Sequence, residues 1–212
     1  MVLRIKKPKD LNLIFCTLLA LWLCLAQVTA NSLLILGCLG SFLVLTAWSA
    51  WKGRSTPLLL FFLPFAPLLK IAPGSVSFYT LALVTVCAVT FVRRKFAINI
   101  GCLVPALALA FLTLIARALE KSGFSMGYIL FLFLLVLFPG VLAELRKDVD
   151  FRKLTVFFAL GIIIAALSAQ QLAGYRTIAR YITVDAWQKI SRLSGYYGDP
   201  NFYSAQISAV LS

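Results

Sequence analysis

The sequence predicts an all-α protein, a polytopic bundle of transmembrane helices with about seven full spans and a truncated eighth. Of its 212 residues, 62% are hydrophobic and only 13% are charged, whereas soluble domains average about 45–50% apolar and about 25% charged residues. No Asp, Glu, Lys or Arg occurs between Leu11 and Trp51. Apolar runs of roughly 20 residues, the length that crosses a hydrocarbon layer of about 30 Å, recur along the chain.

The first three predicted spans follow closely on one another. Leu11–Ala30 and Ser32–Trp51 are long apolar runs, separated only by a tight polar turn at Asn31. Pro57–Ile71 is shorter and contains three prolines. Because proline breaks the hydrogen-bond ladder of a helix, we expect this third span to be kinked or partly re-entrant.

Four further spans complete a predicted membrane bundle over residues 1–170: Phe78–Val92, Phe96–Ala116, Met126–Ala143 and Leu154–Ala169. An eighth apolar run begins near Phe202, and residues 202–212 would reach only about 17 Å as a helix. We therefore expect this chain to be the N-terminal portion of a longer protein. The basic start of the chain and Val28-Thr29-Ala30 are similar to a signal peptide, but the apolar run is longer than usual, which favours an uncleaved first span.

The distribution of basic residues predicts the orientation. Of the 20 Lys and Arg residues, 13 fall at the N-terminus and in alternate loops, and such loops face the cytoplasm. The N-terminus is therefore expected in the cytoplasm, and residues 171–201 are expected to form an outer loop. Because these basic residues are divided among short loops, the net charge of +13 does not indicate nucleic-acid binding.

The composition predicts neither a metal site nor a cofactor. The chain has no histidine, and its five cysteines all lie inside predicted spans without metal-ligand spacing. No pair of acidic residues lies in a span either. Zinc sites and proton relays are built from such side chains.

The outer loop 171–201 differs from the rest of the chain in its basic and turn-forming residues. An apolar stripe at helical spacing, starting at Ile182, predicts a helix on the membrane surface. Aromatic residues, among them Tyr196, suit the depth of the lipid headgroups. Asp199 or Asn201 can cap the eighth span. The loop carries four cations: Arg176, Arg180, Lys189 and Arg192.

Two interpretations of these cations remain open at this point. In the first, the arginines contact lipid phosphates and Gly198-Asp199-Pro200-Asn201 is an ordinary helix start. In the second, they bind an anionic membrane-bound substrate such as a lipid diphosphate, because arginine binds phosphate in a bidentate manner.

The segment Arg192–Asn201, Arg-Leu-Ser-Gly-Tyr-Tyr-Gly-Asp-Pro-Asn, resembles a motif of the O-antigen ligase/O-antigen polymerase family of bacterial envelope enzymes. In that family an Arg is followed by Gly and then by Asp/Asn-Pro-Asn at the mouth of a further span. The matching positions are Arg192, Gly195, Asp199, Pro200 and Asn201. The resemblance of residues 1–170 rests on span number and orientation alone.

The resemblance implies a glycosyltransferase at the outer face of the bacterial cytoplasmic membrane. The donor would be a glycan on a polyprenyl diphosphate, and the acceptor would be a second glycolipid. Arg192 would be catalytic by stabilising the departing diphosphate without a metal. The substrate-binding residues would be Arg176, Arg180, Lys189, Gly195, Asp199 and Asn201. The family's later outer loop, with further Arg and often His residues, has no counterpart here, which leaves the general base unassigned.

Two rival classes of function stay open. A polytopic transporter of lipids or glycans would also bind anionic lipids, and the proline-broken third span is the feature that favours it. A non-catalytic membrane fragment is the other alternative, suggested by the short final run.

Overall fold

The computed structural model describes residues 11–71, 76–93, 100–119, 128–130, 132–137, 150–179, 196, 204–205 and 208. This part of the chain is helical and contains no strand, which confirms the all-α prediction. The elements are α1 (Leu11–Thr29), α2 (Ser32–Trp51), α3 (Ser55–Phe62), η1 (Leu63–Phe65), α4 (Phe78–Arg93), α5 (Ile100–Leu119), α7 (Phe151–Leu172) and α8 (Arg176–Ala179).

The first two helices form a tight antiparallel hairpin. The chain reverses at Ala30, whose φ is 51°, and Asn31 caps α2. The Asn31 side-chain oxygen accepts hydrogen bonds from the backbone N–H of Leu33 at 3.0 Å and of Leu34 at 3.4 Å. Asparagine is a favoured residue at this position because its oxygen satisfies N–H groups that have no partner within the helix.

The helix that begins at Ser55 is broken, as its prolines predict. The α-helix ends at Phe62, continues as one 3-10 turn that contains Pro64, and gives way to turns up to Ile71. The break lies in the core, where Phe61, Phe62 and Phe65 are fully buried. The rings of Phe61 and Phe62 lie 5.1 Å apart in an edge-to-face arrangement, which is favourable for aromatic pairs.

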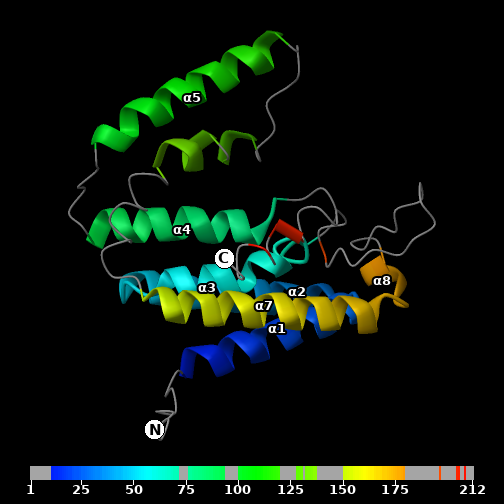
Figure 1. The fold of residues 1–212 in the computed structure, drawn as a ribbon. Coiled ribbons are helices and arrows are strands. Elements are labelled where there is room, and N and C mark those ends of the chain that lie inside the picture. Colours follow the sequence, from blue (N-terminus) through cyan, green and yellow to red (C-terminus); the bar gives the residue numbers. More distant parts are fainter. Residues whose placement is uncertain are drawn as a thin grey trace, which may run out of the picture.

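The main body is formed by helices that run side by side and contact one another: α1, α2, α3, α4 and α7 (Figure 1). α2 packs against α4, and α3 packs against α7. The second contact is close at Gly161, where an added β-carbon would collide with the carbonyl of Phe61. α7 is capped at its start by Asp150, whose carboxylate accepts from the Lys153 backbone N–H at 3.3 Å.

A second, smaller group of helices lies beside α4, away from α1 (Figure 1). It comprises α5 and the helical residues 128–130 and 132–137. The Tyr128 hydroxyl donates to the Thr113 carbonyl at 2.8 Å, and the Arg117 guanidinium lies 4.9 Å from the centre of the Tyr128 ring. Leu134 and Leu137 pack against the main core, so this segment connects α5 to the bundle.

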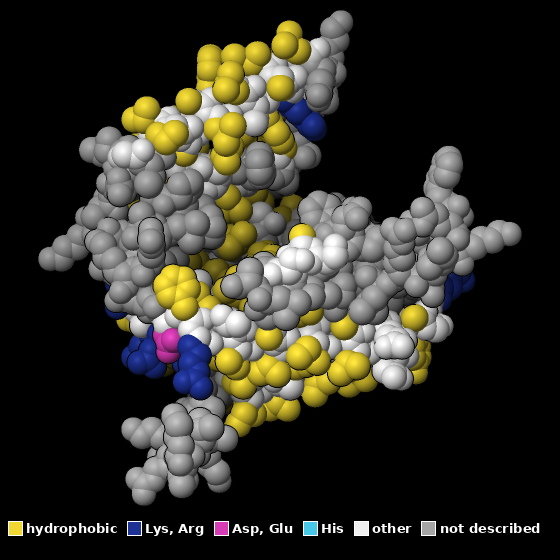
Figure 2. Space-filling view, viewed as in Figure 1, with side chains coloured by type: hydrophobic (Ala, Val, Ile, Leu, Met, Phe, Trp, Pro, Cys, Tyr) yellow, Lys and Arg dark blue, Asp and Glu magenta, His cyan; other side chains and the backbone are white. Residues whose placement is uncertain are grey.

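Among the described helices, α2 and α7 have the length and apolar composition needed to cross a membrane. The described apolar stretches of α1, α4 and α5 are shorter, so the seven-span arrangement stays a prediction. Large apolar side chains are exposed on α1, α2, α5 and α7, and Figure 2 shows them over α5 and along the opposite edge of the bundle. Extended exposed apolar surface is typical of membrane or protein contact.

The two ends of the main body differ in charge. One end, here called the basic end, carries Lys52, Arg54, Arg93, Arg152 and Lys153. The other end, the far end, is formed by the last turn of α1, the turns after η1, the last turn of α7 and α8, and its described cations are Lys70 and Arg176. Figure 2 shows Lys and Arg side chains gathered where α7 begins. This asymmetry follows the alternation of basic loops in the sequence.

Candidate functional site

Tyr196, which lies inside the segment Arg192–Asn201, is buried at the far end of the bundle. Its side chain is 1% exposed. The ring lies 5.9 Å from the ring of Phe65, and the hydroxyl donates to Ser168 Oγ at 2.8 Å. Tyr196 thus contacts η1 and α7 together. The ring faces the inside of the bundle, where polar partners for its hydroxyl lie. Its depth at the lipid headgroups stays a prediction.

A chain of three hydrogen bonds, which runs through Cys24, Tyr196 and Ser168, holds Tyr196 in place. Ser168 Oγ donates to the Ala165 carbonyl at 3.1 Å, which leaves its lone pairs free to accept from Tyr196. Cys24 Sγ lies 3.6 Å from the Tyr196 hydroxyl, so the thiol can donate to that oxygen. Burial raises the pKa of Tyr196 above its ordinary value, so the phenol keeps the proton that it donates. Buried polar groups are stable only when bonded in this way.

Gln27 fixes the turns after η1 to the last turn of α1. Its side chain is fully buried, and Nε2 donates to the carbonyls of Leu68 at 2.8 Å and Lys70 at 3.0 Å. The Phe78 backbone N–H, which begins α4, donates to the Leu69 carbonyl at 2.7 Å. Gln27 Oε1 is buried without a hydrogen-bond partner in the described structure. In the described structure the far end therefore contains a buried acceptor, Gln27 Oε1, to which no side chain donates a hydrogen bond.

The short helix α8 brings Arg176 to the same end. Thr177 Oγ1 donates to the Val28 carbonyl at 3.4 Å, and Ile178 is fully buried. The hydrogen bond joins α8 to α1, and Ile178 packs into the main core, while the Arg176 side chain is exposed. Of the predicted substrate-binding residues, Arg176 is the one that the structure describes.

The far end thus gathers Gln27, Lys70, Arg176 and Tyr196 from segments far apart in the sequence. The predicted catalytic residue and the other predicted substrate-binding residues lie outside the described residues: Arg192, Arg180, Lys189, Gly195, Asp199 and Asn201. Their arrangement stays a prediction. Tyr196 follows Gly195 directly and is four residues after Arg192.

The described residues hold no group of three or more His, Cys, Asp or Glu side chains. Four cysteines are described, all buried and without disulfides: Cys16, Cys24, Cys38 and Cys87. Cys24 bonds to Tyr196 as described above, and Cys38 Sγ lies 3.7 Å from the Leu19 carbonyl. In this part of the chain the thiols act as small core groups, in agreement with the sequence.

Reasoning from the sequence missed Gln27 and Ser168 as parts of the site. A signal for Gln27 was present, because an amide in an apolar span is unfavourable unless it finds partners. Its place three residues before Ala30, at the end of the first run, pointed to the outer loops. Ser168 gave no comparable signal, since serine in a helix commonly bonds to its own backbone.

No protein-family model matches this chain, and neither a curated protein nor a solved structure matches it.

Proposed function

We propose that this chain belongs to a membrane glycosyltransferase of surface-polysaccharide assembly, similar to O-antigen ligases and polymerases. Its substrate is a glycan carried on a polyprenyl diphosphate, and its acceptor is a second glycolipid. The observation that supports the proposal is the burial of Tyr196 at the far end of the bundle, because this residue belongs to the segment Arg192–Asn201.

The membrane location is the first part of this proposal. It is supported by the span-like length of α2 and α7, by exposed apolar side chains such as Leu33 and Val44 (80% and 71% exposed), and by the basic end. A bacterial cytoplasmic membrane, about seven spans and a cytoplasmic N-terminus complete it. Under the positive-inside rule the basic end is cytoplasmic and the far end faces out.

The second part concerns the diphosphate. Arg192 is four residues from Tyr196 in the sequence, and four residues of extended chain reach at most about 14 Å. Arg176 and Lys70 belong to the same end. If the tail of a lipid diphosphate lies in the membrane, its charged diphosphate lies at the membrane surface, at the level of the far end. Binding a diphosphate requires several cations close together.

The reaction that follows is a displacement at the anomeric carbon of the donor glycan. The bond from this carbon to the diphosphate oxygen breaks, and the diphosphate leaves with the electron pair. The acceptor hydroxyl oxygen forms the new bond and releases its proton to water. Arg192, with Arg176 or Arg180, stabilises the charge on the departing diphosphate, because a guanidinium donates two parallel hydrogen bonds to phosphate oxygens.

The remaining motif residues have supporting roles in the proposal. Lys189 adds a cation beside the diphosphate. The flexible backbone at Gly195 permits close approach of the substrate. Asp199 and Asn201 bind sugar hydroxyls or cap the following span.

The test substitutes Arg192 in the full-length protein, expressed in its own cells. Arg192→Ala should lower the amount of polymerised or ligated surface glycan by about a hundredfold or more, comparable to removing one donor from an oxyanion site. Arg192→Lys should restore only part of it, because an ammonium lacks the bidentate fork. Glycan is measured by gel electrophoresis of surface polysaccharide, with protein abundance checked by immunoblot.

Arg152→Ala is the control, since this exposed cation lies at the basic end. It should leave the glycan unchanged. Wild-type glycan in Arg192→Ala cells would refute the catalytic role and leave the loop as a contact for lipid phosphates.

A transporter of lipid-linked glycans is the second candidate, and the broken helix α3–η1 favours it, because interrupted helices form substrate sites in transporters. Around this break, however, the space is filled by Phe61, Phe62 and Phe65, all fully buried. The close packing of these rings argues against a substrate site at the break, and so against the transporter. A transporter would move the donor across the membrane and leave glycan length unchanged in a purified system.

A further inference from the structure

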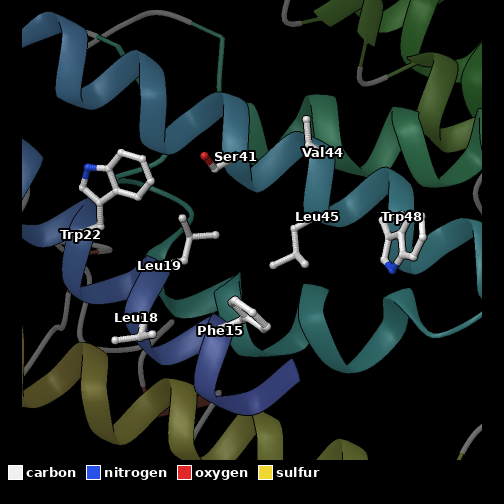
Figure 3. A pocket seen from close by; sticks show the side chains of 8 residues that line it. All are labelled: Phe15, Leu18, Leu19, Trp22, Ser41, Val44, Leu45 and Trp48. Atoms are coloured by element: carbon white, nitrogen blue, oxygen red, sulfur yellow. The ribbon is translucent and has the colours of Figure 1, made fainter. Parts of the chain in front are cut away.

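An apolar groove of about 480 Å³ opens on the surface between α1 and α2, in the half of the bundle nearer the basic end (Figure 3). From α1 it is lined by Phe15, Leu18 and Trp22. From α2 it is lined by Val44, Leu45 and Trp48. The two tryptophans lie at opposite ends of the groove (Figure 3).

A polar pocket of about 400 Å³ continues this groove at the basic end. It is lined by Trp48, Ser49, Lys52 and Arg54, so Trp48 is a wall of both cavities. The Lys52 ammonium lies 5.1 Å from the centre of the Trp48 ring, close enough for a cation–π contact. An apolar slot and a cationic pocket therefore share one side chain.

The positive charge at this pocket is not neutralised within the described structure. No salt bridge joins Lys52 or Arg54 to a carboxylate there. Gly53 lies between these two residues in the sequence, and the Arg93 guanidinium packs against it. Gly53 has a φ of 71°, a conformation that glycine adopts without strain. The turn from α2 to α3 and the last residue of α4 thus bring three cations together beside the end of an apolar groove.

The dimensions of the groove match a lipid tail. From Phe15 to Trp22 a helix rises about 10 Å, roughly a third of the hydrocarbon thickness of a bilayer. In the proposed membrane orientation the groove is short enough to lie within one leaflet, with the cations at the headgroup level of that leaflet. A soluble anion would make no use of the apolar slot, and a zwitterionic lipid would leave the cations partly unneutralised.

We propose that α1, α2 and the turn after α2 form a binding site for one anionic phospholipid. One acyl chain lies in the groove, and the phosphate binds Lys52 and Arg54 beside Trp48. Basic pockets on the cytoplasmic side of membrane proteins bind anionic headgroups in this way. The inference rests on the membrane location in the proposed function but not on glycosyl transfer.

Native mass spectrometry of the purified full chain in detergent tests the site, with phosphatidylglycerol and phosphatidylcholine as probes. The wild-type protein should retain one phosphatidylglycerol at concentrations about tenfold below those needed for phosphatidylcholine. The double variant Lys52→Gln/Arg54→Gln should weaken phosphatidylglycerol binding by about tenfold or more, since each charged hydrogen bond contributes on that scale. Phosphatidylcholine binding should change little.

Two matched controls separate the site from general charge and surface effects. Arg152→Gln/Lys153→Gln removes two cations from the same end but outside the pocket, and should leave phosphatidylglycerol binding unchanged. Val44→Trp fills the groove and should weaken binding of the lipid, whereas Val104→Trp, at an exposed position of α5, should not.

Equal losses in the two double variants, or no preference for phosphatidylglycerol, would overturn the lipid site while leaving the membrane location intact. Membrane insertion is measured separately by resistance to carbonate extraction. A chain released by carbonate would overturn the lipid site and the membrane location together.

Discussion

At the scale of single residues, the far end depends on two polar side chains inside apolar surroundings. Gln27 joins α1 to the turns after η1, and Tyr196 contacts η1 and α7. Gln27 donates to two backbone carbonyls and Tyr196 donates to a serine hydroxyl, so the polar hydrogens of both side chains are bonded inside the core. The two residues therefore give the far end a definite arrangement.

Tyr196→Phe tests the contribution of the hydroxyl. The variant keeps the ring contact with Phe65 but removes the donor to Ser168, and the free energy of unfolding should fall by about 1–2 kcal/mol. Thermal unfolding in detergent measures the effect. Tyr175→Phe, at an exposed position, should be silent; the same loss at both positions would argue against the buried network.

At the scale of elements, the approach of α7 to α3 depends on Gly161. A β-carbon there would collide with the Phe61 carbonyl, and the backbone on that side cannot rotate away as a side chain can. The broken helix α3–η1 can therefore pack closely against α7 only because residue 161 has no side chain.

Gly161→Ala should therefore destabilise the bundle, by about 1–3 kcal/mol as in other overpacked cores. Gly40→Ala is the matched control in α2, where nothing lies within 4 Å of the added carbon. That control should be neutral or stabilising by up to about 1 kcal/mol, because alanine favours a helix. If Gly161→Ala and Gly40→Ala had the same unfolding midpoint, this would contradict the close α3–α7 contact.

The elements also show what the sequence could predict. Asn31 between two apolar runs predicted the α1–α2 hairpin to within one residue, and the prolines predicted the broken third helix. Local patterns suffice there, because caps and proline act on neighbouring backbone. The burial of Tyr196 was not predictable, since its partners Cys24 and Ser168 are 172 and 28 residues away. An aromatic with a polar tip suits either a lipid headgroup or a polar site in a core.

At the scale of the whole molecule, the described structure is an all-α bundle with charge concentrated at one end. Five described cations lie at the basic end of the main body, against Lys70 and Arg176 at the far end. In the proposed function this asymmetry orients the chain in the membrane, and the orientation decides whether the motif meets a substrate on the outer side.

The orientation of α7 is the most direct test of this account, because its two ends belong to opposite ends of the bundle. In a variant with all five cysteines replaced by alanine, single cysteines are placed at Arg152 and at Gln171, both exposed. Intact cells are treated with a membrane-impermeant thiol reagent. The cysteine at Gln171 should react, and the one at Arg152 should react only after the cells are permeabilised. Reaction at Arg152 with none at Gln171 would place the far end in the cytoplasm and contradict an outward-facing transferase site.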